Sequence, residues 1–213
     1  MSWKAAALVA AVLVAGITVS RLAEGGSGTT TWDASRAAGF AAYLMLWVAV
    51  MSGVAVHMRW RPSSNGSLVG VLELHRIAST LALAFVIGHV FGLLIDPVKP
   101  FFSLLDAVVP FTSSYRSVQV GLGTLAEWSL IAVLLSTALS GRMAWKTWKA
   151  VHYASFPCYL FALIHGLTAG SDSQTPIAIM TYVATAAAFS ALLAVRMAGR
   201  DWAAAGEPGI RPS

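Results

Sequence analysis

Four histidines in two apolar segments are the residues of this sequence whose chemistry stands out. His75 and His89 lie 14 residues apart in one segment, and His152 and His165 lie 13 residues apart in another. An ionisable side chain inside a membrane-length apolar segment is costly and usually marks a functional site. Because imidazole is a common ligand of transition metals and of heme iron, the pattern indicates metal-centred chemistry at two positions along each segment.

The two segments are separated by one intervening apolar segment, so as helices they would run parallel. The two histidine levels would then lie roughly 20 Å apart at about 1.5 Å of rise per residue. Each level offers one imidazole from each helix, an arrangement that suits a flat macrocycle held between trans ligands. We therefore predict two porphyrins whose irons are ligated by histidines, one between His75 and His152 and the other between His89 and His165.

The angular spacing of the histidines agrees with this prediction in one helix and not in the other. At about 100° per residue, His89 would lie some 40° from the azimuth of His75, whereas His165 would lie about 140° from that of His152. Pro157 lies between the latter two and cannot donate a helical hydrogen bond. We predict a kink or a tightened turn there, which would bring both imidazoles to the same side.

The composition supplies the setting for these helices, because 57% of the residues are apolar and only 11% are charged. A soluble domain has about 25% charged residues. We expect an all-α integral membrane protein, a single six-helix transmembrane bundle without a soluble FAD or NAD(P)H domain. The expected spans are approximately 3–20, 35–57, 69–95, 119–140, 150–169 and 176–198. The long connector, about 96–118, is expected to form an ordered cap on the membrane surface.

The first apolar segment has two interpretations. Lys4 followed by an apolar run resembles a secretory signal, but no Ala-x-Ala-like cleavage site follows. We favour a retained helix; cleavage would leave five spans and the same histidines.

The distribution of lysine and arginine predicts the orientation. If the N-terminus is cytoplasmic, ten of the 14 basic residues fall on the cytoplasmic side and four on the other. Such a bias is typical of cytoplasmic loops, so both termini are expected inside a multi-pass cell (cytoplasmic) membrane protein. Because the basic residues are scattered between spans, no nucleic-acid partner is expected.

Several residues near the histidines have candidate roles. Arg76 and Arg116 are candidates to bind heme propionates, since arginine pairs bidentately with carboxylates, although both are also plausible interfacial anchors. Small residues beside the ligands, such as Gly88 and Gly92, would leave room for a porphyrin edge or pack helices together. His57, at the end of the second span, is expected at the interface, and Cys158 is expected to be a packing residue.

The sequence resembles the ferric-reductase-like transmembrane domain family, which includes NADPH oxidases, ferric reductases and MsrQ/YedZ-type heme subunits. The resemblance rests on Glu73-Leu74-His75-Arg76, on Trp148-Lys149-Ala150-Val151-His152-Tyr153, and on the spacings to His89 and to His165-Gly166. The connector Leu105–Arg116 and the following Gly121-Leu122-Gly123 look like those of actinobacterial members.

The resemblance implies two b-type hemes, with electrons passing from the cytoplasmic level to the outer level. Larger members carry a C-terminal flavin and nicotinamide domain, which we do not expect in this protein, so FMN, FAD or quinone would reach it through a partner. MsrQ-type members lack one of the four histidines. The expected function is therefore di-heme electron transfer from a cytoplasmic flavoprotein or quinol to an extracytoplasmic acceptor or reductase partner, as an oxidoreductase component.

Two other functions remain open at the level of sequence. The histidines could line the pathway of a metal or proton transporter, or they could be incidental in a structural membrane anchor.

Overall fold

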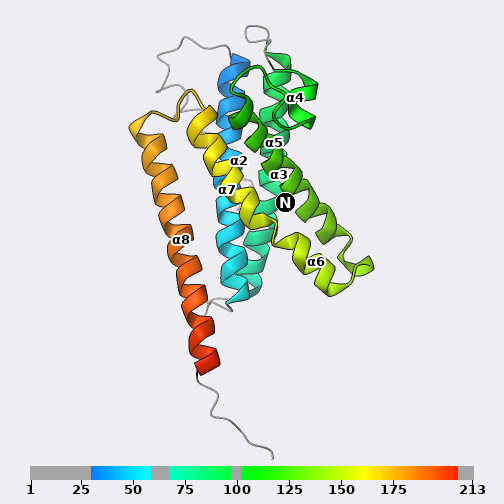
Figure 1. Cartoon of the computed structure of the whole chain (residues 1–213), viewed down its shortest axis with the longest axis vertical. Coiled ribbons are helices and arrows are strands. Elements are labelled where there is room, and N and C mark those ends of the chain that lie inside the picture. Colours follow the sequence, from blue (N-terminus) through cyan, green and yellow to red (C-terminus); the bar gives the residue numbers. More distant parts are fainter. Residues whose placement is uncertain (1–29, 59–67, 97–101, 206–213) are drawn as a thin grey trace, which may run out of the picture.

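The computed structural model describes residues 30–58, 68–96 and 102–205, the last seven of these by their backbone alone. Within these ranges the chain is all-helical (Figure 1). The helices are α2 (Thr30–His57), α3 (Leu68–Ile95), α4 (Leu104–Val108), α5 (Ser117–Ala138), the short 3-10 helix η1 (Ser140–Arg142), α6 (Trp145–His152), α7 (Ser155–Ala169) and α8 (Pro176–Ala205).

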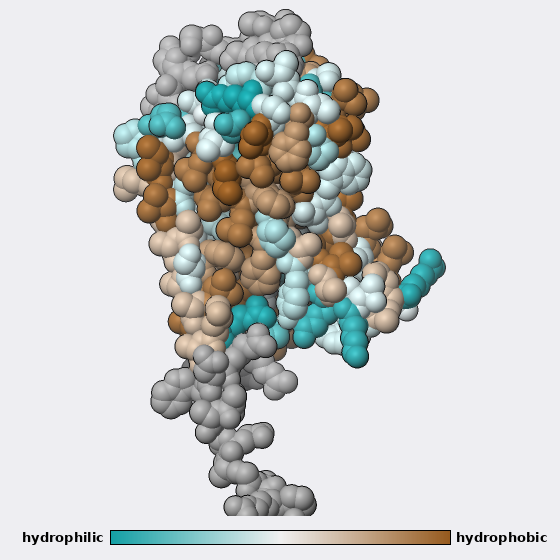
Figure 2. Space-filling model, in the orientation of Figure 1, coloured by the Kyte–Doolittle hydropathy of each residue, from teal (hydrophilic) through white to brown (hydrophobic). Residues whose placement is uncertain are grey.

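Five of these stretches are long and apolar enough to cross a membrane, with α6 and α7 together forming one of them. Large apolar side chains face outward from them; Val69 is 73% exposed and Met180 70% exposed. Figure 2 shows apolar groups over much of the visible flank and hydrophilic groups gathered toward the two ends. These surfaces fit a lipid bilayer, so the expected multi-pass helical membrane fold is confirmed at this level. The predicted span 3–20 lies outside the described residues.

Helix α2 holds the bundle together, since it packs along α3 and also contacts α7 and α8. Small residues allow the close approach to α3: Ala41 on α2 is 1% exposed, and Ala78 and Ala82 on α3 are fully buried. Toward α7 and α8, the hydroxyl of Tyr43 lies 2.5 Å from that of Thr185 and 3.2 Å from that of Tyr159. These three buried hydroxyl groups are thus paired with one another, as a low-dielectric interior favours.

The fifth predicted span is interrupted at Tyr153 and Ala154, where α6 ends and α7 begins. Pro157 has no N–H to donate to the carbonyl of Tyr153, and that carbonyl instead accepts from the N–H of Phe156 at 3.1 Å. The predicted interruption is therefore present, and it is a break between two helices rather than a bend. Figure 1 shows α6 running at a marked angle to α7.

The described part of the long connector, residues 102–116, is ordered and packs on α5. Helix α4 begins with a capping box between Ser103 and Asp106. Burial raises the pKa of Asp106, but hydrogen bonds from the backbone and hydroxyl of Ser103 and from the hydroxyl of Thr112 outweigh it and hold the pKa below its ordinary value. The indole N–H of Trp128 on α5 donates to the carbonyl of Val108 at 2.9 Å, which fastens the connector to the helix.

Candidate functional site

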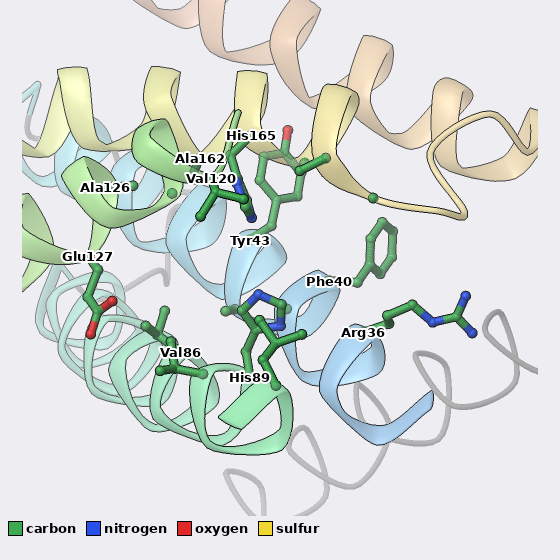
Figure 3. A pocket seen from close by; sticks show the side chains of 18 of the residues that line it. Arg36, Phe40, Tyr43, Val86, His89, Val120, Ala126, Glu127, Ala162 and His165 are labelled. Atoms are coloured by element: carbon green, nitrogen blue, oxygen red, sulfur yellow. The ribbon is translucent and has the colours of Figure 1, made fainter. Parts of the chain in front are cut away.

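The four histidines lie in two pairs, each joining two helices. The ring centroids of His75 and His152 are 6.1 Å apart, with an angle of 63° between the ring planes. Those of His89 and His165 are 6.3 Å apart, at 76°. Figure 3 shows that His89 from α3 and His165 from α7 point toward each other across the bundle. The structure thus brings together the residues that the sequence pairs by depth.

Both imidazoles of α3 rest against α2. Nδ1 of His75 lies 2.7 Å from the carbonyl oxygen of Ala49, and Nδ1 of His89 lies 2.8 Å from that of Ser35. Four residues after each carbonyl comes a glycine against which the ring lies. A Cβ atom would come within 3.1 Å of the His75 ring at Gly53 and within 2.8 Å of the His89 ring at Gly39. We call this combination of a carbonyl and a glycine four residues later a seat.

His165 has the same kind of seat on α5. Its Nδ1 lies 2.8 Å from the carbonyl oxygen of Gln119, and a Cβ atom at Gly123 would lie 2.7 Å from the same nitrogen. Three of the four imidazoles are therefore held by one repeated device on two different helices.

The seats determine which ring nitrogen is available to a metal. A carbonyl oxygen can only accept, so in the three seated rings the proton is on Nδ1 and the lone pair is on Nε2. This is the arrangement typical of metal-ligating histidines, whose second nitrogen donates to a carbonyl or carboxylate and thereby fixes the ring.

His152 is held differently. Its Nδ1 is buried and has no hydrogen-bond partner among the described residues. The ring instead stacks on the indole of Trp148, one turn earlier in α6, with centroids 4.8 Å apart and planes 23° apart.

A cavity opens beside the His89–His165 pair (Figure 3). It contains about 1620 Å³ of space not filled by protein atoms, its open mouth included. Most of its lining is apolar, including Phe40, Val86 and Ala162, and its ionisable lining groups come from five helices and their connectors: Arg36, Tyr43, His89, Tyr115, Glu127, Cys158, His165, Asp172 and Tyr182. The predominantly apolar lining suits a large apolar group.

Arg36 is an arginine of the cavity wall that was not among the predicted site residues. Its guanidinium binds Asp172 at 2.5 Å and Asp33 at 3.0 Å, with only 9% of the side chain exposed. The available signal was its position in the first turns of an apolar span, where a charged residue is expensive.

Arg116 and Arg76, the predicted propionate-binding residues, do not line this cavity. Arg116 precedes α5 with a left-handed backbone, and it donates to the carbonyl of Thr168 at 2.6 Å, which links α5 to the end of α7. The side chain of Arg76 is 73% exposed and lies 3.9 Å from Glu73. His57 ends α2 and is exposed, and Cys158 is buried with its thiol directed at the carbonyl of Ala126.

The glycines that flank the ligands on their own helices have other roles. A Cβ at Gly92 would lie 2.7 Å from the Cβ of Ser35, so this glycine permits helix packing, and at Gly88 it would meet only an ordinary contact. The glycines that make room for the imidazoles lie instead on the facing helices. Their role cannot be read from the residues next to each histidine in the sequence.

The donor set fits heme iron. A metal lies about 2 Å from an imidazole nitrogen and that nitrogen about 1.2 Å from the ring centre, so two rings on opposite sides of one metal have centroids about 6.4 Å apart. Both pairs are close to this separation. Nowhere in residues 30–58, 68–96 and 102–205 do three His, Cys, Asp or Glu side chains gather as they would around a bare metal ion. Two imidazoles suffice for heme, because the porphyrin supplies the other four nitrogens.

No family model matches the chain, and no curated protein or solved structure is detectably similar to it.

Proposed function

We propose that the protein is a di-heme b electron-transfer protein of the membrane, with His75 and His152 as ligands at one level and His89 and His165 at the other. The observation that carries the proposal is the separation of the two ring pairs, 6.1 and 6.3 Å between centroids. Two such pairs in one bundle, both near the separation that two imidazoles sharing one metal would have, are not required by helix packing.

The chain's own contribution is to fix the ligands and to exclude water. The carbonyls of Ala49, Ser35 and Gln119 keep three imidazoles in one tautomer and orientation. The apolar lining of the cavity supplies a low-dielectric surrounding, which tunes a redox centre through burial. Heme, when bound, would supply one-electron redox chemistry at two depths.

The orientation and partners follow from the same proposal. With both termini in the cytoplasm and a sixth span at 3–20, the His75–His152 level lies on the cytoplasmic side, where a flavoprotein or a membrane quinol delivers electrons. The His89–His165 level lies toward the outside, where a reductase partner, ferric iron or oxygen accepts them. Membership of the ferric-reductase-like transmembrane family belongs to this proposal as well, and the location is the cytoplasmic membrane.

The test is a heme count on purified protein from heme-replete cells. We expect two hemes per chain by pyridine hemochrome and a six-coordinate, low-spin spectrum that reductant changes reversibly. Alanine at His89 or His165 is expected to remove one heme, and alanine at the exposed His57 to remove none. A colourless wild-type protein contradicts the proposal.

A transporter is the second candidate, and Glu127 favours it. This carboxylate lies in the middle of α5 and lines the same cavity as His89 and His165 (Figure 3). Histidines and a carboxylate along one cavity are typical of proton or metal pathways. In reconstituted vesicles a transporter loses proton or metal flux on His89→Ala without any chromophore, whereas the di-heme protein loses a heme spectrum.

A further inference from the structure

The helix register places three glycine seats and points to a fourth position. From Gly39 to Gly53 is 14 residues along α2, and from His89 back to His75 is 14 residues along the antiparallel α3. On the other side of the bundle, His152 lies 13 residues before His165. The matching step of 13 residues forward from Gly123 on α5 leads to Ser136.

Ser136 does not provide a seat. It is buried, 6% exposed, and its hydroxyl donates to the carbonyl of Val133 at 2.9 Å. At each of the three seats the glycine has a hydrogen atom where serine has a side chain. A Cβ atom at any of these glycines would come too close to the imidazole unless the ring moved. The Nδ1 atom of the fourth imidazole, His152, has no carbonyl acceptor among the described residues, unlike the other three.

Trp148 contacts the imidazole of His152, which has no seat. Its ring lies nearly parallel to that of His152, with centroids 4.8 Å apart, and the ring of Trp145 also stacks on Trp148, with centroids 4.7 Å apart. The three rings come from one short helix, α6, at positions three and four residues apart, so they lie along one face. The break at Tyr153 and Ala154 separates this face from α7.

We propose that Trp148 is a positioning residue, which holds His152 by ring stacking in place of a backbone seat, and that the His75–His152 level is consequently the one whose ligand is exchanged. The inference rests on the proposed heme function. A hydrogen bond from the second ring nitrogen raises the basicity of a ligating histidine and fixes its orientation. His152 has no such bond among the described residues, so small ligands displace it before they displace His89, His165 or His75.

The experiment measures carbon monoxide binding to the dithionite-reduced, heme-loaded protein. In Trp148→Ala, and in Trp148→Leu, which keeps bulk without an aromatic face, we expect one heme per chain to become high-spin and to bind carbon monoxide. Trp148→Phe restores the stacked face and is expected to keep both hemes low-spin. Trp128→Ala, which removes an exposed tryptophan of α5 that donates to the carbonyl of Val108 and does not stack on either imidazole of the described pair, serves as the matched control.

The low-spin spectrum of the other heme reports that each variant is folded. The same series in a His89→Ala background, where only the His75–His152 level holds heme, assigns the signal to its level. Two low-spin hemes inert to carbon monoxide in Trp148→Ala or Trp148→Leu overturn the inference, as does a carbon monoxide complex that disappears with His89→Ala. An absence of heme in the wild type contradicts the proposed function instead.

Discussion

At the scale of single residues, the positions of three of the four imidazoles depend on glycines, which have a hydrogen atom in place of a side chain. Gly39, Gly53 and Gly123 each leave the space that an imidazole of the facing helix occupies. Glycine inside a helix costs about 0.5–1 kcal/mol relative to alanine. The three positions accept that cost, because a larger residue would displace a ligand.

Gly123→Ala and Gly39→Ala are expected to disturb the His89–His165 level. Their Cβ atoms would approach the rings to 2.7 and 2.8 Å, and neither ring can retreat without losing its carbonyl. The heme count should fall from two to about one per chain. Gly53→Ala, at 3.1 Å, should be milder and confined to the other level.

Gly70→Ala is the control for this series, because a Cβ there meets nothing within 4 Å. It should keep both hemes and leave the melting temperature equal or slightly higher, as helix propensity favours alanine. An unchanged heme spectrum in Gly123→Ala would show that the ring and the helix move apart without effect.

The sequence predicts which histidines lie together but not what holds their rings. His75, His89, His152 and His165 are found by type and spacing, which reflect depth in the membrane. The seats depend on which residue of α2 or α5 faces each ring, and this register is set by side-chain packing between helices. Arg36 was missed and Arg116 preferred for the same reason, since exposure and pairing are properties of the bundle rather than of the local sequence.

At the scale of elements, the break between α6 and α7 brings His152 to His75. The spacing of 13 residues would place His152 and His165 about 140° apart on one continuous helix. Pro157 in the sequence predicts the interruption but not its position at Tyr153 and Ala154. That position follows from the hydrogen bond that the carbonyl of Tyr153 accepts from the N–H of Phe156.

Pro157→Ala is expected to favour a continuous helix, because residue 157 would regain an N–H for the carbonyl of Tyr153. His152 would then turn away from His75, and the protein should lose heme at that level while keeping it at His89 and His165. Absorption and electron paramagnetic resonance spectra, compared with those of His152→Ala, measure this. Two unchanged low-spin signals would mean that the break persists without the proline.

At the scale of the whole molecule, the described residues form five apolar helical stretches with a cavity beside the His89–His165 pair, which makes the bundle asymmetric. Apolar run length predicts the helices to within a few residues: α3, expected over 69–95, is Leu68–Ile95, whereas α2, expected from 35, begins at Thr30. The latter start was missed because the first turn of α2 is polar (Thr-Thr-Trp-Asp), which gives no apolar signal.

The orientation is tested by labelling single cysteines in a Cys158→Ala background, which removes the only native thiol. Ser114→Cys, in the connector before α5, should react with a membrane-impermeant maleimide in intact cells. Ser140→Cys, in the connector before α6, should react only after permeabilisation, because the excess of basic residues predicts that this side is cytoplasmic. Both native serines are exposed, so burial does not limit either reaction. The reverse pattern would invert the proposed direction of electron flow.

The register between α2 and α3 also fixes how far apart the two histidine pairs are. Both helices advance by the same 14 residues between the levels, and their backbones, not the bound groups, determine that length. Tunnelling rates depend steeply on distance, so side-chain variants at either level are expected to change driving force while the hop itself stays the same length. Inserting one residue between Gly39 and Gly53 is different, because it rotates one half of α2 by about 100° against the other and leaves only one imidazole of α3 supported.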